Sequence, residues 1–260
     1  MLLTNLILIV IGLIAAYYME SEGHYVSGMN NQIVWGLPHV VAIFLIVSAS
    51  GALNIASIAS VFRRDFYTPL SRLSAVVATA LLIGGLSVIL LDLGRPDRLL
   101  IAMTTYNFRS IFAWNILLYT GFIGIALIYL WTMLDWQVEK YRKPVGIFAF
   151  CWRLILTTGT GSIFGVLVAR EAYDILVMAP MFIVLSLAYG LACYLVVLCL
   201  FLPEQDWQAF KDRLCRLLVI MIVSGLLMTL LYHVANFWWF GAQAFEKFLL
   251  AGDGVYPWLN

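Results

Sequence analysis

The stretch LLDLGRPDRLLIAMTTYNFRSIFAWN, residues 90–115, is the polar part of an otherwise apolar sequence. Its charged side chains are Asp92, Arg95, Asp97, Arg98 and Arg109. The neighbouring segments 73–93 and 110–134 are each long enough to cross a bilayer and carry almost no charge. Charged groups are rare in the rest of this chain, and Asp92 and Arg109 lie at the ends of the two spans, so their concentration here favours a functional role. The sequence therefore predicts a membrane protein with its chemistry close to this stretch.

Composition extends this class to the whole chain. Of the 260 residues, 63% are hydrophobic and 11% are charged, which is more apolar surface than a soluble domain of this size can cover. The net charge of +1 gives no indication of a nucleic-acid partner. The four cysteines lack CxxC spacing, so the sequence favours neither a zinc site nor an iron–sulfur cluster. We therefore expect an all-α, polytopic transmembrane helix bundle without a bound metal.

Apolar segments of membrane-spanning length recur seven times along the chain. They cover residues 2–18, 33–62, 73–93, 110–134, 145–169, 177–202 and 214–239. Nine basic residues lie on one side of these spans: Arg63, Arg64, Arg72, Lys140, Arg142, Lys143, Lys211, Arg213 and Arg216. Five lie on the other side: Arg95, Arg98, Arg109, Arg170 and Lys247. By the positive-inside rule the first side is cytoplasmic, which places the N-terminus inside and residues 90–115 outside.

Small residues along several spans predict close packing between helices. The second span holds seven of them: Ser48, Ser50, Gly51, Ala52, Ala56, Ser57 and Ala59. Two further pairs are Gly84 with Gly85 in the third span and Gly161 with Gly165 in the fifth. We expect neighbouring helices to approach at these positions.

Several spans bring polar or ionisable groups to the same outer layer. These groups are His39, Asp92, Arg109, Arg170, Glu171, Asp174, His233 and Asn236. Taken singly, each is as well explained by a structural ion pair or an interfacial anchor. Their convergence favours a quinol headgroup, since this ligand arrives laterally from lipid, needs hydrogen-bond partners and releases two protons on oxidation.

The predicted quinone site is a pocket around His39, Asp92, Arg95 and Arg98 in the outer leaflet. Three weaker candidates for its wall are Tyr106, Trp114 and His233. A quinol hydroxyl would donate to His39, while Asp92, held ionised by a nearby arginine, orients the histidine or accepts the second proton. The alternative is that Asp92 only pairs with Arg95 or Arg98 and holds the loop in place.

Two other interpretations of the polar groups remain open. A haem b with His39 and His233 as axial ligands is a less favoured alternative, because three histidines in the chain supply only one candidate pair. In the fifth span, Arg153 and four hydroxyl groups suggest either a transporter or proton channel, or a proton path that joins the quinone site at Asp92 to the cytoplasm. The hydroxyls are those of Thr157, Thr158, Thr160 and Ser162, and Thr157 and Thr158 are the first candidates. We expect Arg153 to face the interior and to have a polar partner, since an unpaired guanidinium in lipid costs at least a few kcal/mol.

Three blocks of sequence resemble the NrfD/polysulfide reductase family of membrane subunits. They are GMNNQIVWGLPHVVAIFLIVSASGALNIASIASVF at 28–62, LLDLGRPDRLLIAMTTYNFRSIFAWN at 90–115 and WRLILTTGTGSIFGVLVAREAYDILVMAPMFIV at 152–184. Within the family, the DsrP-like membrane subunits of the sulfite-reductase-associated DsrMKJOP complex are the most similar. The resemblance covers nearly the whole chain.

The resemblance implies a function as well as a fold. Members of the family interact with quinone or menaquinone and dock on an iron–sulfur, ferredoxin-like subunit, here expected at the outer loops 97–109 and 169–180. His39 matches a histidine that binds quinone in polysulfide reductase. The chain would then exchange electrons between the quinone pool and that subunit in the inner membrane of a prokaryote, whether as the quinol-oxidising or as a non-catalytic subunit. A hydrogenase-type quinone reductase subunit and a purely structural anchor remain alternatives.

The family pattern also predicts how the chain divides. Residues 1–32 would be an extra N-terminal helix and outer loop, and residues 33–260 a NrfD-like bundle. Because family members have eight to ten spans, we expect this bundle to lack its last spans and the protein to continue beyond Asn260.

Overall fold

The computed structural model describes residues 2–30, 35–92, 98–105, 107–165, 175–238 and 243–252. Over these ranges it contains helices and no strand. The α-helices are α1 (Leu2–Glu22), α2 (Leu37–Ala52), α3 (Asn54–Ser60), α4 (Thr68–Asp92), α5 (Leu99–Thr104), α6 (Ile111–Leu134), α7 (Arg142–Gly165), α8 (Ile175–Phe201), α9 (Glu204–Trp238) and α10 (Gln243–Ala251). Short 3₁₀ turns are η1 (His24–Ser27), η2 (Asp65–Tyr67) and η4 (Glu139–Tyr141).

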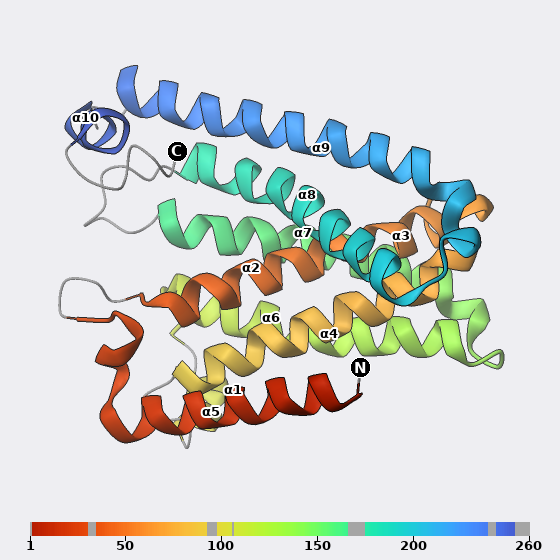
Figure 1. The fold of residues 1–260 in the computed structure, drawn as a ribbon, viewed down its shortest axis with the longest axis horizontal. Coiled ribbons are helices and arrows are strands. Elements are labelled where there is room, and N and C mark those ends of the chain that lie inside the picture. Colours follow the sequence, from red (N-terminus) through yellow and green to blue (C-terminus); the bar gives the residue numbers. More distant parts are fainter. Residues whose placement is uncertain are drawn as a thin grey trace.

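Seven helical segments in the described ranges are long and apolar enough to cross a membrane, which confirms the predicted all-α, seven-span class. They run in alternating directions, as Figure 1 shows, with α2, α4, α6, α7 and α8 side by side and α9 along one edge. The helix α1 lies along the opposite edge and packs mainly against η1. The separation of residues 1–32 from the bundle stays a prediction.

Several helix boundaries differ from the sequence-based ones. The predicted span 33–62 is divided into α2 and α3, which meet at Leu53. The helix α9 begins at Glu204, ten residues before the predicted start, because Trp207, Phe210 and Leu214 bury one side of an otherwise polar segment. The short α5 and α10 were not predicted, since neither has the length of a span.

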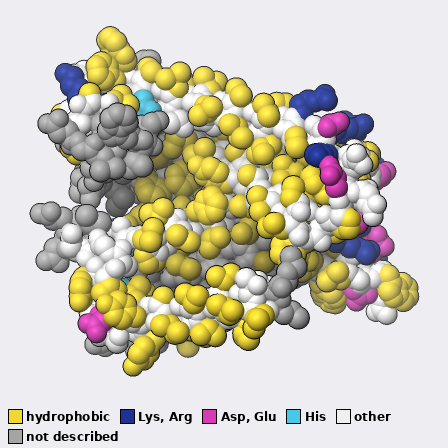
Figure 2. Space-filling model, viewed as in Figure 1, with side chains coloured by type: hydrophobic (Ala, Val, Ile, Leu, Met, Phe, Trp, Pro, Cys, Tyr) yellow, Lys and Arg dark blue, Asp and Glu magenta, His cyan; other side chains and the backbone are white. Residues whose placement is uncertain are grey.

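Charged side chains gather at the two ends of the bundle, while apolar side chains cover its middle, as Figure 2 shows. We call the right-hand end of Figure 1 the basic end, because the helix ends and connections there carry the nine basic residues grouped above. The other end holds the start of α2 and the ends of α4 and α9, and we call it the histidine end after His39 and His233.

The interruption at Leu53 leaves backbone carbonyl groups without regular helical partners at membrane depth. The carbonyl oxygens of residues 50, 51 and 52 accept hydrogen bonds from Arg153 Nη1, Asn54 Nδ2 and Ser74 Oγ, at 2.7, 2.6 and 2.6 Å. The donors come from α7, α3 and α4, so three helices meet at this point. Non-helical backbone is tolerated inside a membrane when protein groups satisfy it in this way.

Helices α2 and α8 cross at Gly51 and Gly190, in almost direct backbone contact. A Cβ atom at Gly51 would lie 1.7 Å from the carbonyl oxygen of Ser186, and one at Gly190 would lie 2.1 Å from the backbone nitrogen of Ala52. The small residues predicted to line the second span are all buried. Close packing at the predicted small positions is therefore confirmed for this helix.

We expect Gly51→Ala to destabilise the protein, because its methyl group requires α2 and α8 to move apart. The free energy of unfolding should fall by roughly 1–3 kcal/mol, the usual cost of overpacking a core. The matched control is Gly124→Ala in α6, where a Cβ atom meets nothing within 4 Å. Thermal unfolding in detergent measures both variants, and equal midpoints for the two would contradict this account of the crossing.

Candidate functional site

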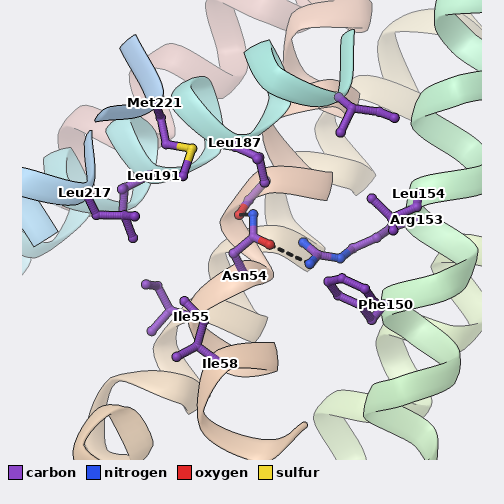
Figure 3. A pocket seen from close by; sticks show the side chains of 12 residues that line it. Asn54, Ile55, Ile58, Phe150, Arg153, Leu154, Leu187, Leu191, Leu217 and Met221 are labelled. Carbon is purple, nitrogen blue, oxygen red and sulfur yellow. Dashed lines mark hydrogen bonds between the residues drawn. The ribbon is translucent and has the colours of Figure 1, made fainter. Parts of the chain in front are cut away.

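The most deeply buried cation among the described residues is Arg153, which is 2% exposed. Its guanidinium donates to the carbonyl oxygen of Ser50 and to Oδ1 of Asn54, and it lies over the ring of Phe150 at 4.7 Å. Figure 3 shows the Asn54 side chain facing this guanidinium. The expectation that Arg153 faces the interior and has a polar partner is confirmed. Its partners are uncharged groups of the interrupted second span.

Polar side chains continue from Arg153 toward the histidine end along one face of α7. Thr157 shares a 2.8 Å hydrogen bond with Ser50, and Thr160 lies 3.3 Å from the hydroxyl of Tyr119. Residues 153, 157 and 160 follow helical spacing, which places them on the same face. Thr158 was predicted in the same path but is exposed, on a different face of the helix.

The row also reaches toward the basic end. The Tyr129 hydroxyl donates to the carbonyl oxygen of Ala56 at 3.0 Å and forms a hydrogen bond with Ser60. At the histidine end, Asn115 donates to the carbonyl oxygen of Gly159 at 3.4 Å. Apart from Thr158, the polar side chains named in this paragraph and in the two before it form a line, which we call the polar row. In order from the histidine end, its members are Asn115, Tyr119, Thr160, Thr157, Ser50, Arg153, Asn54, Tyr129 and Ser60. They run inside the bundle through most of its length.

An apolar groove opens between α4, α5 and α6 in the histidine-end half of the bundle. It has a volume of about 360 Å³, within the range of small-ligand sites. Leu90 and Leu99 line it on either side of residues 93–97, and Tyr119 lines its inner wall. Because the Tyr119 hydroxyl also contacts Thr160, this groove adjoins the polar row.

The predicted site residues fall only partly within the described ranges. Asp92 ends α4, although its side chain lies outside the described residues, as do Arg95 and Tyr106. Arg98 precedes α5 and is exposed. Trp114 is 44% exposed and donates its indole N–H to the carbonyl oxygen of Phe108, as an interfacial anchor does.

His39 lies in the first turn of α2 and is half-buried. Its ring stacks on Trp35, with the planes 2° apart and the centroids separated by 5.5 Å. Trp35 in turn meets Phe164 at the end of α7, edge to face. The imidazole therefore lies against an aromatic cluster that joins α2 to α7, whereas the described groove lies on the α6 side of α4.

His233 has a partner that sequence reasoning missed. Its Nδ1 lies 2.7 Å from Oε2 of Glu246, and Asn236 donates to Oε1 of the same carboxylate at 2.9 Å. Glu246 is fully buried and ties α10 to α9. The structure thus gives His39 and His233 different neighbours, with α7 and α8 between their helices in Figure 1.

Some of the missed residues carried a signal in the sequence. Asn115 and Tyr119 are four residues apart in an apolar span, as are Arg153 and Thr157, and this spacing places each pair on one helix face. Counted from Arg153, helical spacing places Thr160 on the same face of the span and Thr158 on a different one. Asn54 and Glu246 gave no such signal, because their roles depend on a helix interruption and on the docking of α10.

Comparison with known proteins is consistent with this architecture. The family model described as polysulphide reductase, NrfD, matches residues 25–259. The Hdr-like menaquinol oxidoreductase integral membrane subunit of Archaeoglobus fulgidus is 31% identical over 209 residues, which are 80% of this chain and 52% of that protein. A putative dimethyl sulfoxide reductase membrane subunit of Halobacterium salinarum is 28% identical over 280 residues, covering 97% of this chain and 64% of the relative.

A third relative, a selenate reductase subunit of Mesobacillus selenatarsenatis, is 23% identical over 258 residues, covering 84% of this chain and 61% of that protein. The chain thus spans between about half and two thirds of the length of these curated relatives. The family match covers six of the seven spans and leaves out only α1. This multi-pass membrane protein belongs to the polysulphide reductase NrfD family.

Proposed function

We propose that the protein is the quinone-reactive membrane subunit of a multi-subunit oxidoreductase, exchanging electrons between menaquinone in the bilayer and an iron–sulfur partner. Three relatives named as subunits of a menaquinol oxidoreductase and of two reductases support this class. The observation that carries the proposal is the apolar groove whose inner wall, at Tyr119, contacts the polar row. A lipid-soluble ligand and a path for its protons would meet there.

The groove suits a quinone ring in shape and polarity. Its lining is apolar except for hydroxyl groups such as those of Ser87, Tyr119 and Thr120, and its volume of about 360 Å³ accepts a bicyclic ring with part of a tail. The groove reaches Leu90 and Leu99, close along the chain to Asp92 and Arg98. These two residues, with Arg95, would hold the headgroup at the rim, and Tyr106 and Trp114 stay weaker candidates. His233 lies on α9 with Glu246 as its partner, away from this groove.

Oxidation of one quinol releases two protons and two electrons, and each needs an acceptor. In the proposal, Asp92 takes up protons at the histidine end. His39 lies against the aromatic cluster that joins α2 to α7, so its part in the site is supported by the family resemblance alone. Thr160, Thr157 and Arg153 in the polar row link that end to the basic end, a route that the sequence suggested through Arg153, Thr157 and Thr158. The electrons leave to the iron–sulfur partner, whose clusters accept them one at a time.

The partner and the orientation are proposals of the same kind. The iron–sulfur subunit would dock at the histidine end, on segments 97–109 and 169–180, as in a DsrMKJOP-like complex of sulfur metabolism. The basic end would face the cytoplasm of a prokaryote across its inner membrane, with the N-terminus inside, because basic residues gather there.

The quinone site is tested by Asp92→Asn and His39→Gln in the intact complex. We expect Asp92→Asn to slow the oxidation of a menaquinol analogue by about a hundredfold or more, the usual contribution of a positioned proton acceptor. An equal loss with His39→Gln would mean that the headgroup binds at the aromatic cluster instead of in the groove. The control is His24→Gln, which removes the histidine of η1 and lies outside the family match. Size-exclusion chromatography verifies that the partner subunits stay bound.

Two results would contradict the assignment. A wild-type rate and pH profile for Asp92→Asn would mean that Asp92 only holds its loop in place. Loss of assembly without a change in the rate of the complexes that still form would favour a structural anchor.

The polar row is tested by Thr157→Val, which keeps the side-chain volume and removes the hydrogen bond to Ser50. We expect electron transfer to continue while the number of protons moved per electron falls, because the row is interrupted. The matched control is Thr158→Val, one residue away but exposed. A pH-sensitive dye inside vesicles measures the ratio. If the proton-to-electron ratio falls with Thr158→Val and not with Thr157→Val, protons follow the sequence-based path through Thr158 and the polar row does not conduct them.

A further inference from the structure

A second pocket lies at the basic end, far from the groove. It has a volume of about 420 Å³ and opens between η2, the end of α3 and residues 213–220 of α9. Three arginines line it, Arg64, Arg213 and Arg216, together with Tyr67. Its remaining lining is apolar: Ile58, Leu217 and Ile220. The pocket therefore combines a strongly basic mouth with an apolar base.

The three arginines have no carboxylate partner within 4 Å among the described residues. Two other cations at the same end are paired, Arg142 with Glu139 at 3.3 Å and Lys211 with Glu204. Arg213 instead lies over the ring of Phe66 at 4.3 Å. This contact orients the guanidinium but leaves its positive charge without a counter-ion. Three converging positive charges without an anion attract a negatively charged ligand.

The apolar lining of this pocket is shared with an inner cavity. Ile58 and Leu217 also line the cavity beside Asn54 and Arg153, which has a volume of about 280 Å³ and is otherwise almost entirely apolar. Figure 3 shows Ile58, Leu191, Leu217 and Met221 around that cavity. The two spaces therefore adjoin at Ile58 and Leu217, with the arginines on one side and the apolar cavity on the other.

We propose that this site binds an anionic phospholipid. The phosphate group lies among Arg64, Arg213 and Arg216, and one acyl chain passes between Ile58 and Leu217 into the inner cavity. The second chain follows the apolar face of α9, where Ile220 and Val223 are exposed. A quinone carries no net charge that would pair with three arginines, and a free anion makes no favourable contact with the apolar cavity. An anionic amphiphile binds to both parts, because its phosphate pairs with the arginines and its acyl chain with the apolar residues.

The lipid would also add to the contacts between η2 and α9, where the rings of Phe66 and Phe210 already lie 4.5 Å apart. Helix α9 packs mainly against α8, whereas the pocket places it opposite α3 and η2 across the three arginines. A phosphate group between Arg64 and Arg213 joins these elements and removes the repulsion of the like charges. Binding therefore stabilises the docking of α9.

The site is tested with the full chain purified in a mild detergent and titrated with phosphatidylglycerol or phosphatidylcholine of identical acyl chains. Native mass spectrometry counts the bound lipids, and thermal unfolding reports stabilisation. We expect phosphatidylglycerol to bind more tightly and to raise the unfolding midpoint more. The double variant Arg213→Gln, Arg216→Gln should weaken phosphatidylglycerol binding by about thirtyfold, roughly fivefold for each charge removed, and leave phosphatidylcholine binding unchanged.

The matched control removes two exposed basic residues from the same end but outside the pocket, Arg72→Gln with Lys143→Gln. It should change phosphatidylglycerol binding little. Equal losses in the two double variants would mean that the overall charge of the basic end attracts the lipid, and would overturn the proposal. So would unchanged binding in the Arg213 and Arg216 variant, or equal stabilisation by inorganic phosphate, which would indicate a site for a free anion.

The acyl-chain half is tested separately with Leu217→Trp, which narrows the passage to the inner cavity. We expect weaker phosphatidylglycerol binding at an unchanged unfolding midpoint without added lipid. If binding stays at the wild-type level, the chain does not enter the cavity and that part of the proposal is wrong.

Discussion

The contact on which the rest of the bundle depends is the one between Arg153 and the interrupted second span. A guanidinium without partners and carbonyl groups without donors would each cost several kcal/mol inside a membrane. Here they satisfy one another, with Asn54 and Ser74 supplying the remaining donors. The interruption and the buried cation are tolerable only together. Helices α2, α3, α4 and α7 are therefore held in one arrangement by a small set of hydrogen bonds.

The surroundings of this contact follow from the same constraint. Close approach of α8 at Gly51 and Gly190 seals the interruption from lipid, and Thr157 binds both Ser50 and the carbonyl oxygen of Arg153. Polar groups in a membrane bundle are retained where they face the interior, and here they form a row parallel to the helix axes. The row touches an apolar groove near the histidine end and an apolar cavity near the basic end. Both ligand sites proposed above thus adjoin the same internal structure.

Sequence reasoning succeeded where a single helix decides the outcome. The seven spans, the small residues of the second span and the inward direction of Arg153 each follow from the composition of one segment in a solvent without water. The prediction of Thr158 was wrong because helical spacing was not applied strictly. In an ideal helix Thr158 lies about 140° around the axis from Arg153, whereas Thr160 lies on the same face as Arg153. Asp92, Arg95 and Tyr106 stay predictions, because their side chains lie outside the described residues.

The sequence by itself determined the class of protein, the number of spans and the grouping of basic residues at one end, because the bilayer selects long apolar helices and the charge of their loops. Only the tertiary structure decided which polar groups meet. The Arg153 partners are about 100 positions away in the chain, Tyr119 contacts a threonine of another span, and Glu246 reaches His233 from a helix too short to predict. Such contacts depend on how helices cross and where one is interrupted, and helical periodicity within one span contains no information about its neighbour.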